Sequence, residues 1–126
     1  MPVAAAQFAQ AKYLNLETFR KSGVGVQTPV WFAQLPGRAL FYVYSEADAG
    51  KVKRVRNNAK VRVAPCNFRG SVTGEWIDAR ARICDATEAL QGQLLLRRKY
   101  GLLKILGDVF GRIMGHQNAM LAIDLT

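Results

Sequence analysis

The chain has 126 residues, half of them hydrophobic, and carries 18 Lys and Arg against 9 Asp and Glu, a net charge of +9. The length and apolar content predict one folded domain, residues 1–126, and exclude a disordered polar chain. The charge excess favours a polyanionic partner and leaves open a phosphorylated small molecule, a nucleic acid or an anionic membrane.

Several expected absences narrow the class of protein. Residues 1–6 lack the basic start and long apolar run of a signal peptide, so we expect a cytoplasmic protein. No uncharged apolar stretch approaches the ~20 residues that a membrane span needs. Cys66 and Cys84 show no metal-binding spacing and are too few for a disulfide framework, so we expect reduced thiols and no metal site.

The patterns along the chain predict mostly strands. In chain order, the expected elements are a short helix at 7–12, strands at 14–20, 24–34 and 39–44, a basic helix within 46–58, strands at 60–66 and 75–85, helices at 87–100 and 102–114, and a closing strand at 119–125. The strands are predicted from alternating or strongly β-forming residues, and the helices from apolar residues three or four apart. This order favours an antiparallel sheet that closes as a barrel.

Turn and cap residues set the expected boundaries. Pro29 argues that the strand at 24–34 lies at a sheet edge or contains a bulge. The turn at 35–38 joins that strand to the next one as a hairpin. Thr87 is the expected N-cap of the helix that Gly101 ends or kinks.

The segment 45–54 has the features of an anion site. A helix that opens directly after a strand points free N–H groups outward, and Gly50 allows a ligand to approach the backbone. Lys51 and Arg54 lie three residues apart, hence on one helix face, where both can bind a phosphate. Ser45 adds a hydroxyl donor at the strand end. The same residues also fit a solvated charged face, and nucleic-acid or membrane-surface binding is a further alternative.

Several motifs, in this order and spacing, resemble the pyridoxamine 5'-phosphate oxidase-like superfamily. The residues that carry the resemblance are 18–23, 28–31, 41–45, 50–54, Asn57 and Asn58. A second set, 64–66, Gly70, 73–76, 79–82 and 98–101, is similar to its probable F-420 (deazaflavin)-dependent subfamily.

The resemblance implies a split β-barrel of about six antiparallel strands and a homodimer with two cofactor sites at the subunit interface. It implies FMN or the deazaflavin F-420 as cofactor, rather than the haem that a few members bind. The cofactor-binding residues that it implies are Thr28, Pro29, Val30 and Trp31 for the ring, and Tyr44, Ser45, Gly50, Lys51 and Arg54 for the phosphate.

One departure from the family pattern bears on activity. The family's FMN oxidases carry an Arg and a Lys on the second strand, where this chain has Val26, Val30, Phe32 and Gln34. We therefore do not expect a true pyridoxamine phosphate oxidase.

The chain offers few candidate acid–base groups. His116 is its single histidine, and no catalytic residue is identified, which suits a reaction that the cofactor itself performs. The first hypothesis is an oxidoreductase that reduces a small molecule. The alternatives are a non-catalytic flavin or haem carrier and, third, a nucleic-acid-binding module; under the first hypothesis neither nucleic acid nor membrane is a partner.

Overall fold

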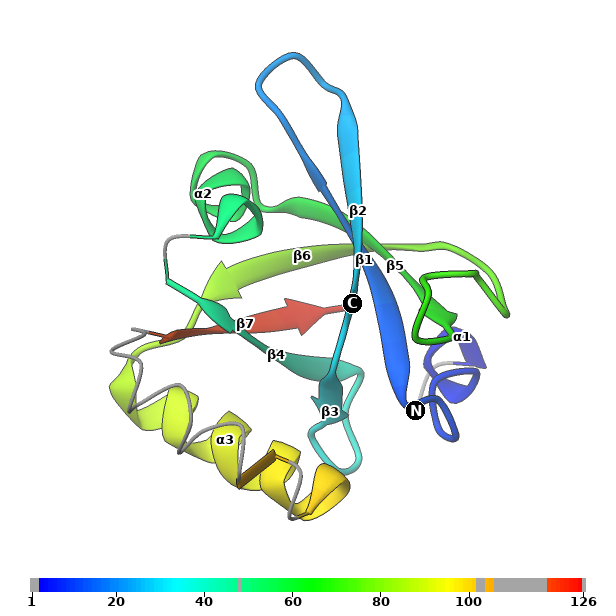
Figure 1. The fold of residues 1–126 in the computed structure, drawn as a ribbon, viewed down its shortest axis with the longest axis vertical. Helices are drawn as coiled ribbons and strands as arrows, with labels where there is room; N and C mark the ends of the chain where they lie inside the picture. The colour runs from blue at the N-terminus through cyan, green and yellow to red at the C-terminus, as the bar shows by residue number, and fades with distance from the viewer. Residues whose placement is uncertain (1–2, 48, 102–103, 106–117, 126) are drawn as a thin grey trace.

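The computed structural model describes residues 3–47, 49–101, 104–105 and 118–125 (Figure 1). Its elements in chain order are α1 (Val3–Ala6), β1 (Tyr13–Phe19), β2 (Gly25–Val30), β3 (Phe32–Gln34), β4 (Leu40–Glu46), α2 (Gly50–Asn57), β5 (Lys60–Cys66), β6 (Ile77–Ile83), α3 (Ala86–Tyr100) and β7 (Asn118–Asp124). Most of the helix expected at 102–114, and His116, lie outside the described residues. Among the residues described, no helix is long and apolar enough to cross a membrane.

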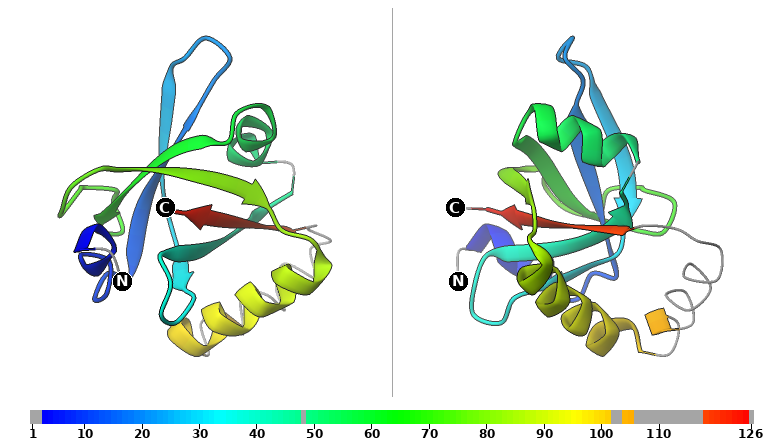
Figure 2. Two further views of the ribbon diagram at one scale, coloured as in Figure 1. Left: turned by 180° about the vertical axis from the view of Figure 1, so that it is seen from behind. Right: turned by 90° about the vertical axis from the view of Figure 1, so that its left-hand side faces the viewer.

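The seven strands form one antiparallel sheet in the order β2-β1-β5-β6-β7-β4-β3. β2 and β3 lie at opposite edges of the sheet, although only Trp31 separates them in the chain. One stretch of backbone therefore pairs with β1 at one end and with β4 at the other, which curls the sheet (Figure 2). The expected split barrel is confirmed, with the strand predicted at 24–34 divided into two.

Two apolar clusters lie on the two faces of this curled sheet. The inward-facing residues of the strands form the larger cluster, and Val52 and Val55 of α2 pack into it. α3 covers part of the outer face, where Leu96 packs with Tyr42 and Met120. Successive residues of a strand therefore face different surroundings, which decides where each candidate site residue points.

A polar cluster fixes α3 on the outer face. The Glu88 carboxylate accepts hydrogen bonds from the Tyr42 hydroxyl at 3.0 Å and from Arg82 Nη2 at 2.8 Å. Arg82 lowers the pKa of Glu88, while burial raises the pKa of Tyr42 to about 12.

Two local predictions are wrong. The helix at this end of the chain is α1, which stops at Ala6, and residues 7–12 form turns instead. The Phe8 N–H bonds the carbonyl of Ala5, three residues earlier, as in a turn, and the Phe8 side chain is buried. Asp85, rather than Thr87, caps α3: its carboxylate accepts the Glu88 N–H at 2.9 Å. An acidic side chain at this position also interacts favourably with the helix dipole.

Candidate functional site

The start of α2 is the centre of the candidate site. α2 follows the end of β4 and begins at Gly50, with Ala49 as an N-cap that offers no side-chain acceptor. The first turn of this helix contains no acidic residue. Its N-terminal N–H groups and partial positive charge therefore lack a side-chain acceptor in the helix itself, as in anion sites at helix N-termini.

Arg54 lies across this helix start. Its Nε donates a hydrogen bond to the hydroxyl of Thr18 on β1 at 2.6 Å, and Thr18 is fully buried. The guanidinium comes so close to Gly50 that a Cβ placed there would lie 2.7 Å from Arg54 Nη1. A Cβ at position 50 would therefore make the end of the guanidinium shift, while the hydroxyl of Thr18 holds its Nε.

Lys51 adds a second cation beside Arg54. Burial lowers the pKa of Lys51, the charge of Arg54 lowers it further, and the nearby Glu46 opposes these effects. Burial likewise lowers the pKa of Arg54, with a contribution from the charge of Arg20. Among the described residues, no carboxylate forms a salt bridge with Lys51 or Arg54. Bound anions would relieve this repulsion and favour both protonated forms.

β4 sends its two candidate residues to opposite faces. Ser45 is 7% exposed and donates a long, 3.3 Å hydrogen bond to the carbonyl of Glu46, so its hydroxyl has capacity for a better acceptor. Tyr44 instead faces α3, with Lys104 Nζ 3.6 Å from its ring centroid, and lines a groove of about 320 Å³ there. Ser45 therefore faces the inner side of the sheet, on which α2 packs, whereas Tyr44 faces α3.

The candidate residues of β2 also divide between two faces. Thr28 pairs with Leu16 and Val30 packs on the inner cluster, so both face inward, while Pro29 is exposed on the outer side. The Thr28 hydroxyl is buried and has no hydrogen-bond partner among the residues that the structure describes. A buried hydroxyl without a protein partner is uncommon, so this group is available to hydrogen-bond a ligand or water.

Trp31 lies in the break between β2 and β3. Its ring stacks on Tyr100 of α3 at a centroid distance of 4.4 Å and an angle of 5°. The Tyr100 hydroxyl accepts the N–H of Phe32 at 3.0 Å and lies 2.6 Å from the carbonyl of Lys12, which ties α3 to the break. One face of the Trp31 ring is therefore occupied by Tyr100.

Sequence reasoning missed two residues near the site. Thr18, which positions Arg54, lies on the same face of β1 as Leu14 and Leu16. The alternation of residues along the strand predicts that Thr18 points inward, but it does not identify Arg54 as the hydrogen-bond partner of Thr18. Arg20, which follows the end of β1, lies close enough to Arg54 for its charge to lower the pKa of Arg54. Both depend on contacts between segments more than 30 residues apart.

The chain matches no protein-family model and no curated protein. Its fold is similar to that of HutZ, the haem storage protein of Vibrio cholerae, with a TM-score of 0.72 and 14% identity over 98% of this chain and 87% of HutZ. Conserved hypothetical protein Rv2991 of Mycobacterium tuberculosis gives a TM-score of 0.69 and 17% identity, over 97% of this chain and 79% of Rv2991.

A third similar structure is a Clostridium acetobutylicum protein related to general stress protein 26, of the pyridoxinephosphate oxidase family. Its TM-score is 0.68 at 11% identity, and the alignment covers 97% of this chain and 80% of that protein. At these identities the likeness concerns the fold, which is the split barrel of pyridoxamine phosphate oxidase-like proteins.

Proposed function

We propose that this protein is an oxidoreductase that binds FMN or a deazaflavin at the start of α2 and reduces a small molecule. The observation that carries the proposal is the arrangement of Arg54, held by Thr18 over Gly50, beside Lys51 at a helix start that no acidic residue of α2 neutralises. A phosphate here would receive charge-assisted hydrogen bonds from two side chains and the helix N–H groups.

The inner face of β2 fits the ring of such a cofactor. Val26 pairs with Thr18, and Thr28 is the next inward residue of β2, about 7 Å further along the strand. The unsatisfied Thr28 hydroxyl offers a hydrogen bond to a polar ring edge, and Val30 adds apolar contact. When bound, the cofactor supplies hydride transfer, while this chain holds the phosphate and orients the ring.

We further propose that two copies of the chain assemble as a homodimer and complete the site between them. The support is the resemblance of its motifs to a superfamily of homodimers, together with the split-barrel fold. A chain of this length gains buried apolar area from such an assembly.

A non-catalytic carrier of flavin or haem is the second candidate function. HutZ, which has the same fold, is described as a haem storage protein, and this likeness is what favours the alternative. The two functions differ in what the bound cofactor does: an enzyme reoxidises its reduced cofactor with a substrate, whereas a carrier releases the cofactor unchanged.

The absorbance spectrum and mass of the co-purifying cofactor, followed by titration with FMN, F-420 and haem, test this proposal. We expect FMN or F-420 to bind, and Lys51→Ala with Arg54→Ala to weaken that binding at least tenfold. Lys53→Ala with Arg56→Ala is the matched control, because it removes the same charge at the same spacing from exposed positions of α2. Equal affinity in both double variants, or binding of haem alone, would refute the proposed function.

A further inference from the structure

The register of β1 and β2 extends beyond the last pair that the two strands form. That pair is Leu14 with Val30, and two further residues along each strand place Lys12 opposite Phe32. Their main-chain groups are joined through a side chain instead: the Phe32 N–H donates to the hydroxyl of Tyr100 at 3.0 Å, and this oxygen lies 2.6 Å from the Lys12 carbonyl. The hydroxyl thus bridges the two strands at the point where they separate.

Lys12 and Phe32 are the kind of pair that normally exchanges main-chain hydrogen bonds. In an antiparallel ladder every second pair does so, and the Arg20 N–H bonds the Val24 carbonyl at 2.9 Å. The two pairs belong to the same alternate set, because they lie an even number of residues apart along each strand. The hydroxyl of Tyr100 therefore takes the place of one ladder hydrogen bond and keeps the two strands apart.

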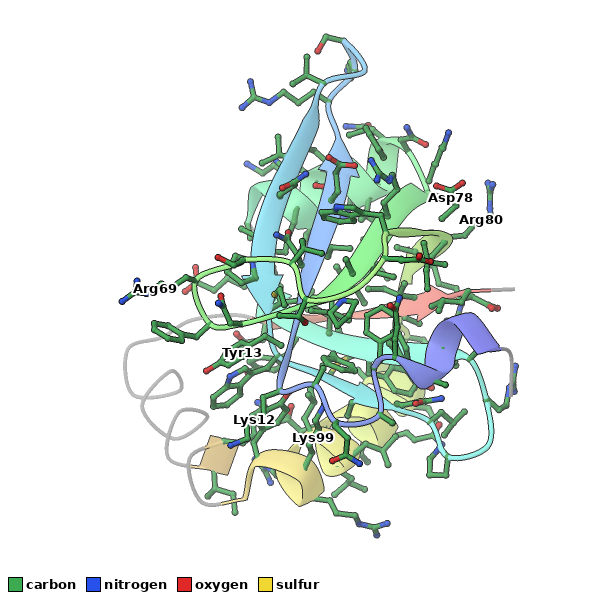
Figure 3. All side chains as sticks on the ribbon, turned by 90° about the vertical axis from the view of Figure 1, so that its right-hand side faces the viewer. Lys12, Tyr13, Arg69, Asp78, Arg80 and Lys99 are labelled. Carbon is green, nitrogen blue, oxygen red and sulfur yellow. The ribbon has the colours of Figure 1, made fainter. Side chains whose placement is uncertain are left out.

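The last two residues of α3 hold this bridge in place. The Tyr100 ring stacks on Trp31 at a centroid distance of 4.4 Å. Lys99 Nζ donates to the Phe32 carbonyl at 2.9 Å and lies 3.5 Å from the centroid of the Phe32 ring, at the same end of the molecule as Lys12 (Figure 3). Burial raises the pKa of Tyr100 to about 12, so near neutral pH the hydroxyl keeps the proton that it donates to the Lys12 carbonyl.

We infer that Tyr100 is a positioning residue for the proposed cofactor site, because its hydroxyl ends the β1–β2 ladder just beyond Val30. Val30 packs on the inner cluster, on the same face of β2 as Thr28, where the cofactor ring is proposed to bind. Without the hydroxyl, the buried Phe32 would lose the acceptor of its N–H, and the Lys12 carbonyl, which is in register, would replace it. That closure would draw the chain after Val30 toward β1 and change how Val30 meets the ring. The inference rests on the proposed function and adds a residue of α3 to its site.

The phosphate part of the site should not depend on this bridge. Arg54 is held by Thr18, which lies four residues along β1 from Leu14, hence about 13 Å away. Loss of the Tyr100 hydroxyl should therefore weaken the contacts of the cofactor ring and leave the binding of a phosphate alone unchanged. This difference separates a positioning role from a general loss of stability.

The experiment compares Tyr100→Phe, which keeps the ring that stacks on Trp31, with the matched control Tyr42→Phe. The control also removes a hydroxyl that ties α3 to the sheet, since Tyr42 bonds Glu88 at 3.0 Å, but it does so on β4. The probes are FMN, F-420 and inorganic phosphate. We expect Tyr100→Phe to bind the cofactor that the wild type binds at least fivefold more weakly, and to keep the inhibition constant of phosphate, measured in competition with that cofactor, within twofold. Tyr42→Phe should change neither value.

A second measurement needs no cofactor. In the ligand-free Tyr100→Phe variant, an NMR coupling across a hydrogen bond should join the Phe32 amide to the Lys12 carbonyl, and the wild type should lack it. Absence of this coupling from the variant would show that the ladder does not close, which overturns the inference.

The affinities decide the rest. Equal cofactor affinity in the two variants, or an equal loss of cofactor and phosphate binding, would overturn the positioning role while the proposed function stands. If Tyr100→Phe does not fold, Lys99→Met, which removes the donor to the Phe32 carbonyl, replaces it and should show the same pattern. The proposed function fails separately, when Lys51→Ala with Arg54→Ala binds the cofactor as well as the wild type does; both fail if the wild type binds neither FMN nor F-420.

Discussion

Replacing Thr18 with Val tests whether the buried hydroxyl positions Arg54 for phosphate binding. The substitution removes the acceptor that lies 2.6 Å from Arg54 Nε, at a fully buried site that Val fills with nearly the same shape. A hydrogen bond to a charged group contributes about 1.5–3 kcal/mol. Because the released guanidinium regains contact with water, we take the lower end of this range, which corresponds to about tenfold weaker FMN binding.

The assay is fluorescence titration of FMN into four proteins: wild type, Thr18→Val, Arg54→Ala and the double variant. If Thr18 acts through Arg54, its substitution weakens binding in the wild-type background and has no effect once Arg54 is absent. Thr18→Ser keeps the hydroxyl and should restore most of the affinity. An equal loss in both backgrounds, or none in either, would refute the reasoning.

Three further substitutions have opposing or pH-dependent effects. Thr28→Val removes a buried hydroxyl without a partner, so it should stabilise the free protein by about 1 kcal/mol in urea unfolding, yet weaken cofactor binding. Gly50→Ala should keep or raise the melting temperature but weaken FMN binding several-fold, because its Cβ displaces the Arg54 guanidinium. Glu88→Gln should cost about 1 kcal/mol at pH 7, where the carboxylate binds Arg82. Because the folded pKa of Glu88 is lowered, this cost is present above its ordinary pKa and disappears as the pH falls through the folded value, so unfolding at pH 7 and pH 3 should show it.

Local sequence patterns predicted most of the strands. The strand expected at 60–66 matches β5 at both ends, since Val61 and Val63 alternate with polar residues and Asn58 precedes them. The edge position of Pro29 is also confirmed, because β2 is an outer strand of the sheet. These features depend on residues close together in the chain, which is why the sequence alone was sufficient.

The break at Trp31 could not be predicted in the same way. Residues 24–34 have strong β-forming character throughout, and the strand divides because its two ends pair with different partners, β1 and β4. Tyr100 satisfies the N–H of Phe32 at the break, and it comes from a helix 68 residues further along the chain. The face of Tyr44, by contrast, was already implied by its alternation with Val43 and Ser45, and the sequence reasoning did not use it.

The candidate site depends on the register of β1 more than on α2 itself. Gly50, Lys51 and Arg54 come from one short segment, but Arg54 is fixed by Thr18, whose inward position follows from its pairing with Val26 and Val61. A slip of one residue in β1 would replace Thr18 with an outward-facing neighbour, and the buried acceptor for Arg54 would be lost. The same slip would turn the side chain of Glu17, which is now buried on the outer face with Arg62, to the inner face near Arg54. Pairing of the sheet therefore determines both where Arg54 points and whether the start of α2 keeps the positive charge on which the proposed phosphate site depends.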